Sequence, residues 1–359
     1  MMLVAALWLA PQLIGMTSLP REGPGGLPVG GLSGVDRDKR TGDYYLISDD
    51  RSEHGPARLW RAAIDYDVGR APAARLIEPI PLRTRTGGHF PPPGTGAEAS
   101  DGEAIRVAPD GQGLVWSSEG DRKDGFGPAV RLAARDGRWL RDVPLPPMFR
   151  YDPGEKGGPR LNLSIEGLSF DGRHLWIGLE APLFQDGPLA ASATGADVRL
   201  SRIDPKSGRL ERQYAYPVEP IGPVPAGRLA DNGVSEILAI DARHILVVER
   251  SGIQQPDGDF RYHARLWCAS TDGASQVGTR RSLQDRAYTP LRKRLVFDFS
   301  RSPDRIDSVE GMSWGKILSN GHASLVFVTD NDFSPQRENQ LIFLDIGARR
   351  ARAAAALCT

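Results

Sequence analysis

The sequence predicts an all-β protein, a β-propeller with five visible four-stranded blades. Three observations lead to this fold class. Five segments of matching pattern recur along the 359 residues, their first positions lie 63 to 74 residues apart, and helical periodicity is nearly absent. The 41 glycines and 29 prolines are scattered singly or in pairs, as expected for turns between many short strands.

Each repeat opens with a predicted hairpin: a small or acidic residue, a short apolar strand, a turn, a second apolar strand and a terminal carboxylate. The five segments are LSGVDRDKRTGDYYLISDD, GEAIRVAPDGQGLVWSSEG, IEGLSFDGRHLWIGLEA, SEILAIDARHILVVERS and VEGMSWGKILSNGHASLVFVTDN. A period near 70 residues has room for four strands, and four antiparallel strands repeated radially describe a propeller blade.

Two further strand-like runs follow each of the first four hairpins. They are ARLWRAAI and ARLIEPIPL, AVRLAARD and LRDVPLP, DVRLSRID and LERQYAYPV, and ARLWCAST and RKRLVFDFS. The fifth repeat supplies one more run, NQLIFLDI at 339–346, so we expect QLIGMTSL at 12–19 to complete its blade. Closing the ring with strands from both termini removes an exposed edge. Six blades is the alternative, with further strands in 181–197 or 270–293.

This pattern predicts one propeller domain over 12–347, flanked by a signal-peptide remnant at 1–11 and a disordered tail at 348–359. The N-terminal apolar stretch lacks a positive flank and a clean cleavage site, yet it favours a periplasmic or secreted protein. Tyr45, Trp116, Trp176 and Phe327 lie within second strands and are expected to pack between blades.

Composition excludes several classes of partner. The 45 basic and 45 acidic residues cancel, which removes the electrostatic argument for binding nucleic acid or an anionic membrane. No apolar run reaches the length of a transmembrane segment, and a closed neutral ring makes a monomer the default. Cys268 and Cys358 are expected as two unpaired thiols, because Cys358 lies in the predicted tail; a single disulfide is the alternative.

The residues that flank each hairpin are the candidate functional residues. The residue entering the first strand and the residue leaving the second lie at the same end of a hairpin, so each repeat places two polar side chains together. These pairs are Ser33 with Asp49, Glu103 with Glu119, Glu166 with Glu180, Glu236 with Glu249, and Glu310 with Asp330. If the hairpins form the inner parts of the blades, nine carboxylates surround one mouth of the central channel.

Such crowding of like charge raises pKa values or requires a counter-ion, and hard oxygen ligands favour calcium or magnesium. We therefore assign six acids as metal ligands: Asp49, Glu103, Glu166, Glu236, Glu310 and Asp330. Arg51, Arg122 and Arg250 follow several of these positions and, with Ser33, are the candidate contacts for a small anionic substrate. The alternative for each single acid is a hydrogen bond to backbone amides at a turn.

Ten motifs, in order, resemble the bacterial family described as esterase-like activity of phytase. They are GGLSGVD, YYLISDDR, SDGEAI, SSEGDR, SIEGLSFDG, LWIGLEAPL, VSEILAID, VVERSG, SVEGMSW and VTDNDF, and the resemblance covers the chain from about Gly30 to Ile346. The resemblance implies a propeller related in shape to alkaline phytases, usually exported, often a hydrolase of phosphate or carboxylic esters, with calcium. The lysine-rich phosphate grip of an alkaline phytase is not evident here, which argues against phytate as substrate.

Two functional hypotheses follow. In the first, the protein is a calcium-dependent ester hydrolase in which the metal polarises an ester oxygen and activates water. Glu119, Glu180 or Glu249 would then act as the general base, and Arg51, Arg122 and Arg250 would neutralise developing negative charge. In the second, a non-catalytic propeller binds a ligand or partner at the same mouth and uses calcium only to hold the ring together.

Overall fold

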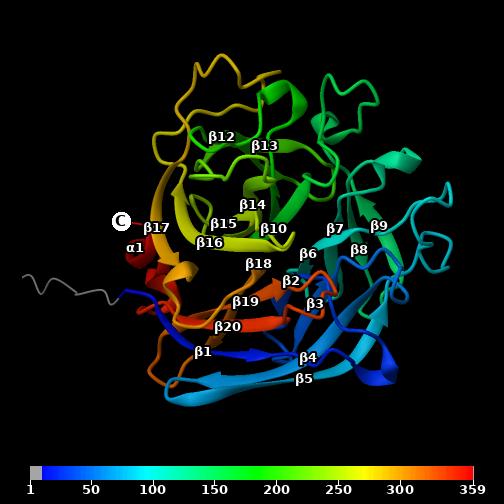
Figure 1. Cartoon of the computed structure of the whole chain (residues 1–359), viewed down its shortest axis with the longest axis vertical. Helices are drawn as coiled ribbons and strands as arrows, with labels where there is room; N and C mark the ends of the chain where they lie inside the picture. The colour runs from blue at the N-terminus through cyan, green and yellow to red at the C-terminus, as the bar shows by residue number, and fades with distance from the viewer. Residues whose placement is uncertain (1–9, 359) are drawn as a thin grey trace, which may run out of the picture.

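The computed structural model describes residues 10–358 and contains five four-stranded antiparallel sheets arranged around a central axis (Figure 1). The five-bladed β-propeller is therefore confirmed. The stretches that could have held a sixth blade, 181–197 and 270–293, form no sheet of their own; they are loops with the 3-10 turn η4 at Phe184–Asp186, and their ends belong to strands of blades 3 and 4. The predicted signal-peptide remnant at 1–11 falls almost entirely outside the described residues.

Each of the first four blades takes its strands consecutively, from the axis outward. The four sheets are β2 (Leu32–Arg37), β3 (Tyr44–Ser48), β4 (Arg58–Asp67) and β5 (Arg70–Pro81); β6 (Gly102–Val107), β7 (Leu114–Ser118), β8 (Ala129–Ala133) and β9 (Trp139–Val143); β10 (Ile165–Asp171), β11 (His174–Leu179), β12 (Ala196–Ile203) and β13 (Leu210–Val218); and β14 (Ala230–Ala239), β15 (His244–Gln254), β16 (Phe260–Ser270) and β17 (Arg292–Asp298). Short 3-10 turns connect some strands, namely η1 (Pro24–Gly26), η2 (Arg122–Asp124), η3 (Pro147–Phe149) and η5 (Phe299–Arg301).

The fifth blade joins the two ends of the chain. It consists of β18 (Ser308–Ile317), β19 (Ala323–Asp330), β20 (Gln340–Asp345) and β1 (Gln12–Ser18). Strand β1 pairs antiparallel with β20, with Thr17 opposite Leu341. The expected closure by an N-terminal strand is confirmed, and it covers the edge that β20 would otherwise expose.

The hydrophobic core lies between the faces of neighbouring blades rather than in one central mass. Five clusters of buried residues each draw on two adjacent blades. The second-strand aromatics Tyr45, Trp116, Trp176 and Phe327 are all buried in these clusters, so their predicted packing between blades is confirmed. This arrangement leaves the polar ends of the inner strands to line the channel.

The C-terminal segment is ordered, contrary to the predicted disordered tail. It forms the turn η6 (Arg350–Arg352) and the helix α1 (Ala353–Leu357), with Ala353 and Leu357 buried against the blade 4–blade 5 core. Cys358 forms a disulfide with Cys268, so the expectation of two unpaired thiols is wrong. The segment is ordered because its apolar side chains are buried and the disulfide anchors it, although its sequence carries no capping signal.

Among the described residues, no helix is long and apolar enough to cross a membrane.

Replacing Cys358 with serine should lower the free energy of unfolding by about 2–4 kcal/mol, because the disulfide closes a long loop in the unfolded chain. The two cysteines are 90 residues apart. Urea unfolding of the wild type and Cys358→Ser, each with and without dithiothreitol, measures the effect. Dithiothreitol should not shift the variant further, and equal midpoints for the oxidised wild type and the variant would contradict the expectation.

Candidate metal centre at the channel mouth

A β-bulge in every innermost strand places one residue of that strand at the channel mouth. In β2, Leu32 lies opposite Ser48 while Gly34 lies opposite Ile47, so Ser33 is the extra residue. The same one-residue shift occurs in β6, β10, β14 and β18. Bulges of this kind turn a side chain out of the regular alternation. The five residues so placed are Ser33, Glu103, Glu166, Ser235 and Glu310.

One residue near the corresponding end of each second strand faces the same mouth; it directly follows β3, β7 and β11, is the last residue of β19, and lies within β15. In blades 1, 2, 3 and 5 it is the predicted acid. These four acids are Asp49, Glu119, Glu180 and Asp330. In blade 4 it is Arg250, which pairs with Gly233. Blade 4 thus carries serine and arginine where the other blades carry mostly acids, and both predicted blade 4 acids are shifted by one residue from the positions assigned to them.

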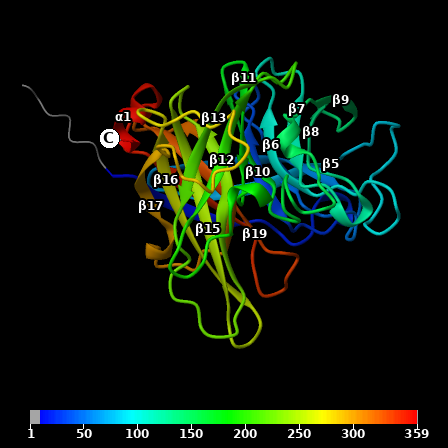
Figure 2. The ribbon, with the colours of Figure 1, turned by 90° about the horizontal axis from the view of Figure 1, so that it is seen from above.

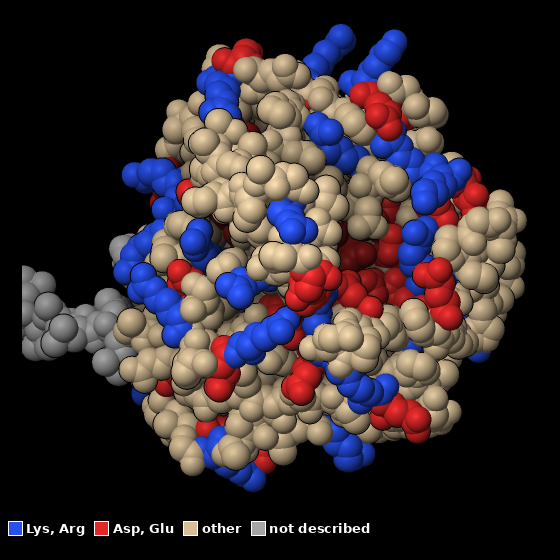
Figure 3. Space-filling view, in the orientation of Figure 1, with Lys and Arg blue, Asp and Glu red and all other residues tan. Residues whose placement is uncertain are grey.

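Seven of the nine predicted acids therefore lie together at the mouth, joined by Asp101. Three carboxylates, Asp101, Glu103 and Glu119, have oxygen atoms within 4.8 Å of one another, and Glu119, Glu166 and Glu180 form a second such set. Asp101 was not among the predicted site residues, although SDGEAI places it two residues before Glu103. Figure 3 shows acidic side chains gathered in a hollow near the centre of the molecule's face.

Burial and mutual repulsion raise the pKa values of this carboxylate cluster. Burial raises the pKa of Glu119 to about 7, against the hydrogen bond that its carboxylate accepts from the Ser164 amide. Burial, with the neighbouring charges of Asp332 and Glu310, raises the pKa of Asp49 to about 7. Burial, with the charges of neighbouring acids, also raises the pKa of several others. These are Asp101, Glu103, Glu166 and Asp330. Fully ionised, the cluster therefore requires added positive charge.

Two arginines supply part of that charge. Arg250 donates from Nη2 to Glu180 Oε1 at 3.0 Å, and its Nε lies 3.1 Å from Glu310 Oε1. Arg51 Nη2 lies 2.9 Å from Asp121 Oδ2, and its Nε lies 3.8 Å from Asp101 Oδ2. Eight carboxylates at the mouth against these two cations leave a large excess of negative charge.

The remaining predicted contacts lie at the rim. Ser33 is buried at its bulge, with its hydroxyl 3.4 Å from the Gly31 carbonyl. Gly31 itself has φ 59°, and a Cβ there would lie 1.8 Å from Asp49 Oδ1, so only glycine leaves room for that carboxylate. The Arg122 guanidinium lies over the rings of Tyr151 and Phe184, where aromatic faces attract it.

Glu236 lies away from the cluster, on the channel axis. Its Oε2 is 2.7 Å from Arg106 Nη2, and its Oε1 accepts hydrogen bonds from the amides of Leu168 and Ile237. Arg106 in turn donates to the Val35 and Ile237 carbonyls, on blades 1 and 4, so its side chain crosses the axis. The structure thus gives Glu236 an arginine partner inside the channel and does not bring it to the acidic mouth.

Glu249 also points elsewhere. Its Oε1 accepts hydrogen bonds from Tyr216 at 2.6 Å and from Lys293 at 2.5 Å, and its Oε2 accepts one from the Glu219 amide at 3.0 Å. The aromatic rings of Tyr216 and Trp267 flank the Lys293 ammonium. Glu249 is consequently a hydrogen-bonded partner of a buried lysine on the outer side of the blade.

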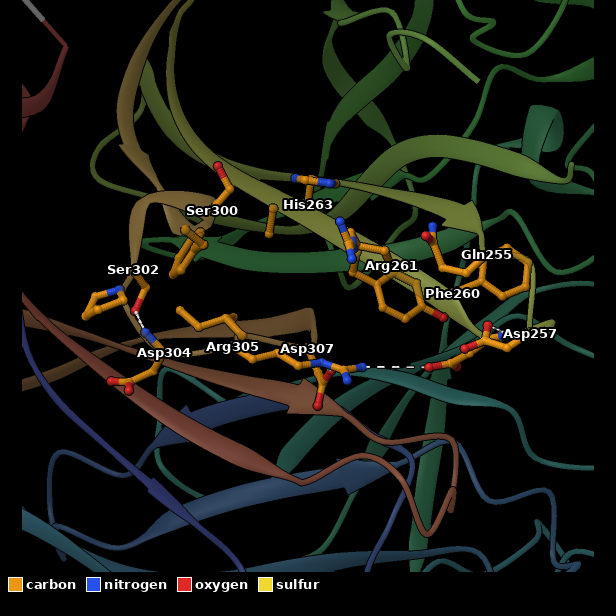
Figure 4. A pocket seen from close by; sticks show the side chains of 16 residues that line it. Gln255, Asp257, Phe260, Arg261, His263, Ser300, Ser302, Asp304, Arg305 and Asp307 are labelled. Atoms are coloured by element: carbon orange, nitrogen blue, oxygen red, sulfur yellow. Dashed lines mark hydrogen bonds and ion pairs between the residues drawn. The ribbon is translucent and has the colours of Figure 1, made fainter. Parts of the chain in front are cut away.

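A cavity of about 500 Å³ adjoins the mouth between the β15–β16 hairpin and the loop before β18 (Figure 4). Arg305 extends across it toward Asp259, at 3.7 Å. Tyr262 forms part of its wall, and the Arg250 guanidinium lies over the Tyr262 ring, so the cavity lies next to a residue that pairs with the carboxylate cluster. The hairpin therefore provides space beside the acids.

The carboxylate cluster fits a hard divalent cation. All its donors are oxygens, which calcium prefers, and a bound cation would offset the repulsion that raises the pKa values. Residues of both three-carboxylate sets are at most 8% exposed, so water compensates their charge poorly. Glu119 belongs to both sets, so its carboxylate would take part in holding a cation at either one.

Fold and mouth together define a β-propeller with a carboxylate-lined channel mouth. Within that class the chain belongs to the Phytase-like family, described as esterase-like activity of phytase, whose profile matches residues 27–333. The family points to a hydrolase-type propeller. Among curated proteins, none matches this chain.

Solved structures show only distant likeness. The chain is 11% identical to an α-L-arabinofuranosidase of Podospora anserina in complex with cellotriose, covering 93% of this chain and 96% of that one, with a TM-score of 0.42. It is 11% identical to the GH62 α-L-arabinofuranosidase catalytic domain of Coprinopsis cinerea, covering 93% and 97%, with a TM-score of 0.41. The N-terminal domain of Nup159 gives 10% identity, coverage of 94% and 95%, and a TM-score of 0.33. Likeness this weak says nothing about activity.

The metal-stripped protein should lose stability as the pH rises. Because the folded pKa values of Glu119 and its neighbours lie above their unfolded values, the folded state binds more protons than the unfolded chain at mildly acidic pH. The free energy of unfolding should therefore fall by on the order of 3 kcal/mol between about pH 5 and about pH 8. Calcium should restore it at the higher pH.

Urea unfolding after chelation, with and without added calcium, checks this pH dependence. Glu119→Gln should flatten it, whereas Glu78→Gln, on the exposed outer strand β5, should leave it unchanged. A stripped protein that is equally stable at both pH values would contradict the expectation.

The variant Glu236→Gln should show that the axial ion pair stabilises the fold independently of the metal site at the mouth. Removing one partner of a buried pair leaves the Arg106 charge uncompensated, so the free energy of unfolding should fall by about 3–5 kcal/mol. The added stability on calcium binding should remain as in the wild type. If thermal unfolding showed that Glu236→Gln had lost the calcium response, Glu236 would instead be a residue of the metal site.

Proposed function

We propose that the protein is a calcium-dependent hydrolase of phosphate or carboxylic esters that acts at the acidic channel mouth. The observation that carries this proposal is the pair of buried carboxylate sets that share Glu119. When bound, calcium supplies positive charge and Lewis acidity toward an ester oxygen. Family membership supports hydrolysis as the reaction class.

Glu103, Glu119 and Glu166, with Asp101, form the metal-holding part of the mouth, and Asp49, Glu310 and Asp330 extend it toward blades 5 and 1. Glu180 is the best-placed general base. Its carboxylate belongs to the second set but not to the first, and it accepts a hydrogen bond from Arg250, which fixes its orientation. Burial raises the pKa of Glu180, which increases its affinity for a proton taken from water.

The arginines near the mouth would bind the anionic part of the substrate. Arg51 retains 27% side-chain exposure, and Arg122 lies on the rim over two aromatic rings. Arg250 is already engaged by Glu180 and Glu310, so its contribution would be to limit negative charge as the ester oxygen becomes charged. The cavity of Figure 4 offers space for the unreactive part of the substrate.

We also propose that the protein acts outside the cytoplasm, as the sequence predicted for a periplasmic or secreted protein. The disulfide supports this location, since such bonds persist in oxidising compartments.

Hydrolysis of p-nitrophenyl phosphate and p-nitrophenyl acetate by the chelated and calcium-loaded protein tests the function. The double variant Glu119→Gln/Glu166→Gln should abolish calcium binding, measured by calorimetry, and reduce turnover at least about 100-fold. Glu180→Gln should keep calcium binding and lose turnover by a similar factor, as expected of a base.

Glu78→Gln serves as the control and should retain both properties. Calcium binding without turnover of either ester in the wild type would favour the second hypothesis, a calcium-stabilised propeller that binds a ligand or partner. Turnover that survives chelation would contradict the metal-dependent mechanism directly.

A further inference from the structure

The channel end opposite the carboxylate cluster holds a second cavity of about 500 Å³. Its lining carries five basic side chains against three acidic ones, so its charge is opposite to that of the acidic mouth. The basic residues are Arg37, Lys39, Arg40, Arg106 and Arg350. Of the acids, Asp38 is already paired with Arg135 at 2.8 Å.

Arg106 and Glu236 separate the two ends of the channel. Arg106 reaches from blade 2 to carbonyls on blades 1 and 4, and its ion pair with Glu236 occupies the axis between them. A ligand in the second cavity is therefore held apart from the carboxylate cluster. Arg106 is 3% exposed, and its Nε has no hydrogen-bond partner among the described residues, so one buried donor remains at the base of this cavity.

Arg350 also carries a buried donor without a hydrogen-bond acceptor, and unlike Arg106 it has no carboxylate partner among the residues that the structure describes. Its guanidinium lies over the Trp314 ring, its buried Nη1 lacks a hydrogen-bond partner, and no carboxylate within the described part of the chain lies at ion-pair distance. The charge of Asp36 favours the charged form of Arg350, but its carboxylate accepts hydrogen bonds from Ser313 and from the Val107 amide. Burial lowers the pKa of Arg350 to about 9. Because arginine stays charged in proteins, this lowering reflects a desolvation cost that a bound anion would offset.

The C-terminal segment holds Arg350 in place. Helix α1 follows directly after Arg350–Arg352, packs into the blade 4–blade 5 core and is linked to β16 by the disulfide. Figure 2 shows α1 at the opposite end of the strands from the tip of the β15–β16 hairpin, which borders the acidic mouth. The ordered C-terminal segment thus places the Arg350 guanidinium at a cavity to which the five blades alone would not supply it.

We propose that this second cavity binds a small aromatic carboxylate. The carboxylate would pair with Arg350 and accept a hydrogen bond from Arg106 Nε, and the ring would pack on Trp314, Phe170 and Leu238. The two donors without partners, on Arg106 and Arg350, lie beside apolar walls. They suit a singly charged, weakly hydrated head with an apolar body better than a phosphate dianion, which needs more donors.

Titration of benzoate into the oxidised full-length protein, followed by calorimetry and saturation-transfer NMR, tests the site. We expect a dissociation constant of about 1 mM or tighter and weaker binding of uncharged benzamide. Arg350→Gln should weaken benzoate binding about tenfold or more, and Arg350→Lys should weaken it less. Arg349→Gln, the exposed neighbouring arginine, is the matched control and should bind as the wild type does.

Urea unfolding shows whether the variants fold. Without ligand, Arg350→Gln should be at least as stable as the wild type, because it removes a charge that lacks a partner. The proposal fails if the wild type does not bind benzoate, if Arg349→Gln loses affinity as much as Arg350→Gln, or if inorganic phosphate competes with benzoate at equal concentration.

Discussion

The space at the propeller axis limits which side chains the innermost strands can carry. Five inner strands converge there, and just past the bulge four of them carry glycine or alanine, namely Gly34, Ala104, Gly167 and Gly311. A Cβ on Gly34 would lie 2.5 Å from the Glu103 carbonyl, and one on Gly311 would lie 2.7 Å from the Gly34 Cα. Blade 4 alone carries a large side chain at this level, and Glu236 is accommodated because Arg106 pairs with it across the axis.

The axial pair divides the channel into two ends of different chemistry. On one side the bulges direct acids toward a common mouth, where their repulsion is relieved only in part by Arg51 and Arg250. On the other side Arg106 and Arg350 retain donors without acceptors. One end therefore carries buried negative charge that the chain compensates only in part, and the other carries buried donors without acceptors. Buried polar groups left in this state are more typical of binding sites than of structural cores.

Much of the fold could be predicted from the sequence because blade repetition repeats the same local signals. The strand runs, the closure by residues 12–19 and the packing of second-strand aromatics all follow from periodicity and turn residues. The residues of the site were harder to predict, because a shift of one residue in strand register changes which side chain reaches the mouth. The hairpin turn of blade 4 is one residue longer than that of blade 3, so matching Glu236 to Glu166 shifted its first strand.

A signal for the correct register was nevertheless present. His174 and His244 occupy equivalent turn positions, and six residues after each stand Glu180 and Arg250, the two residues that do reach the mouth. Glu249 resembles the acids of the other blades in charge, but it lies one residue before the position that reaches the mouth. The C-terminal segment had no such signal, because its order arises from contacts of Ala353 and Leu357 and from a disulfide between distant residues. Blade 4 therefore departs from the pattern at two positions of the mouth, where arginine replaces an acid and serine replaces glutamate. The mouth thereby has two fewer negative charges and one additional positive charge, which reduces the repulsion among the remaining acids.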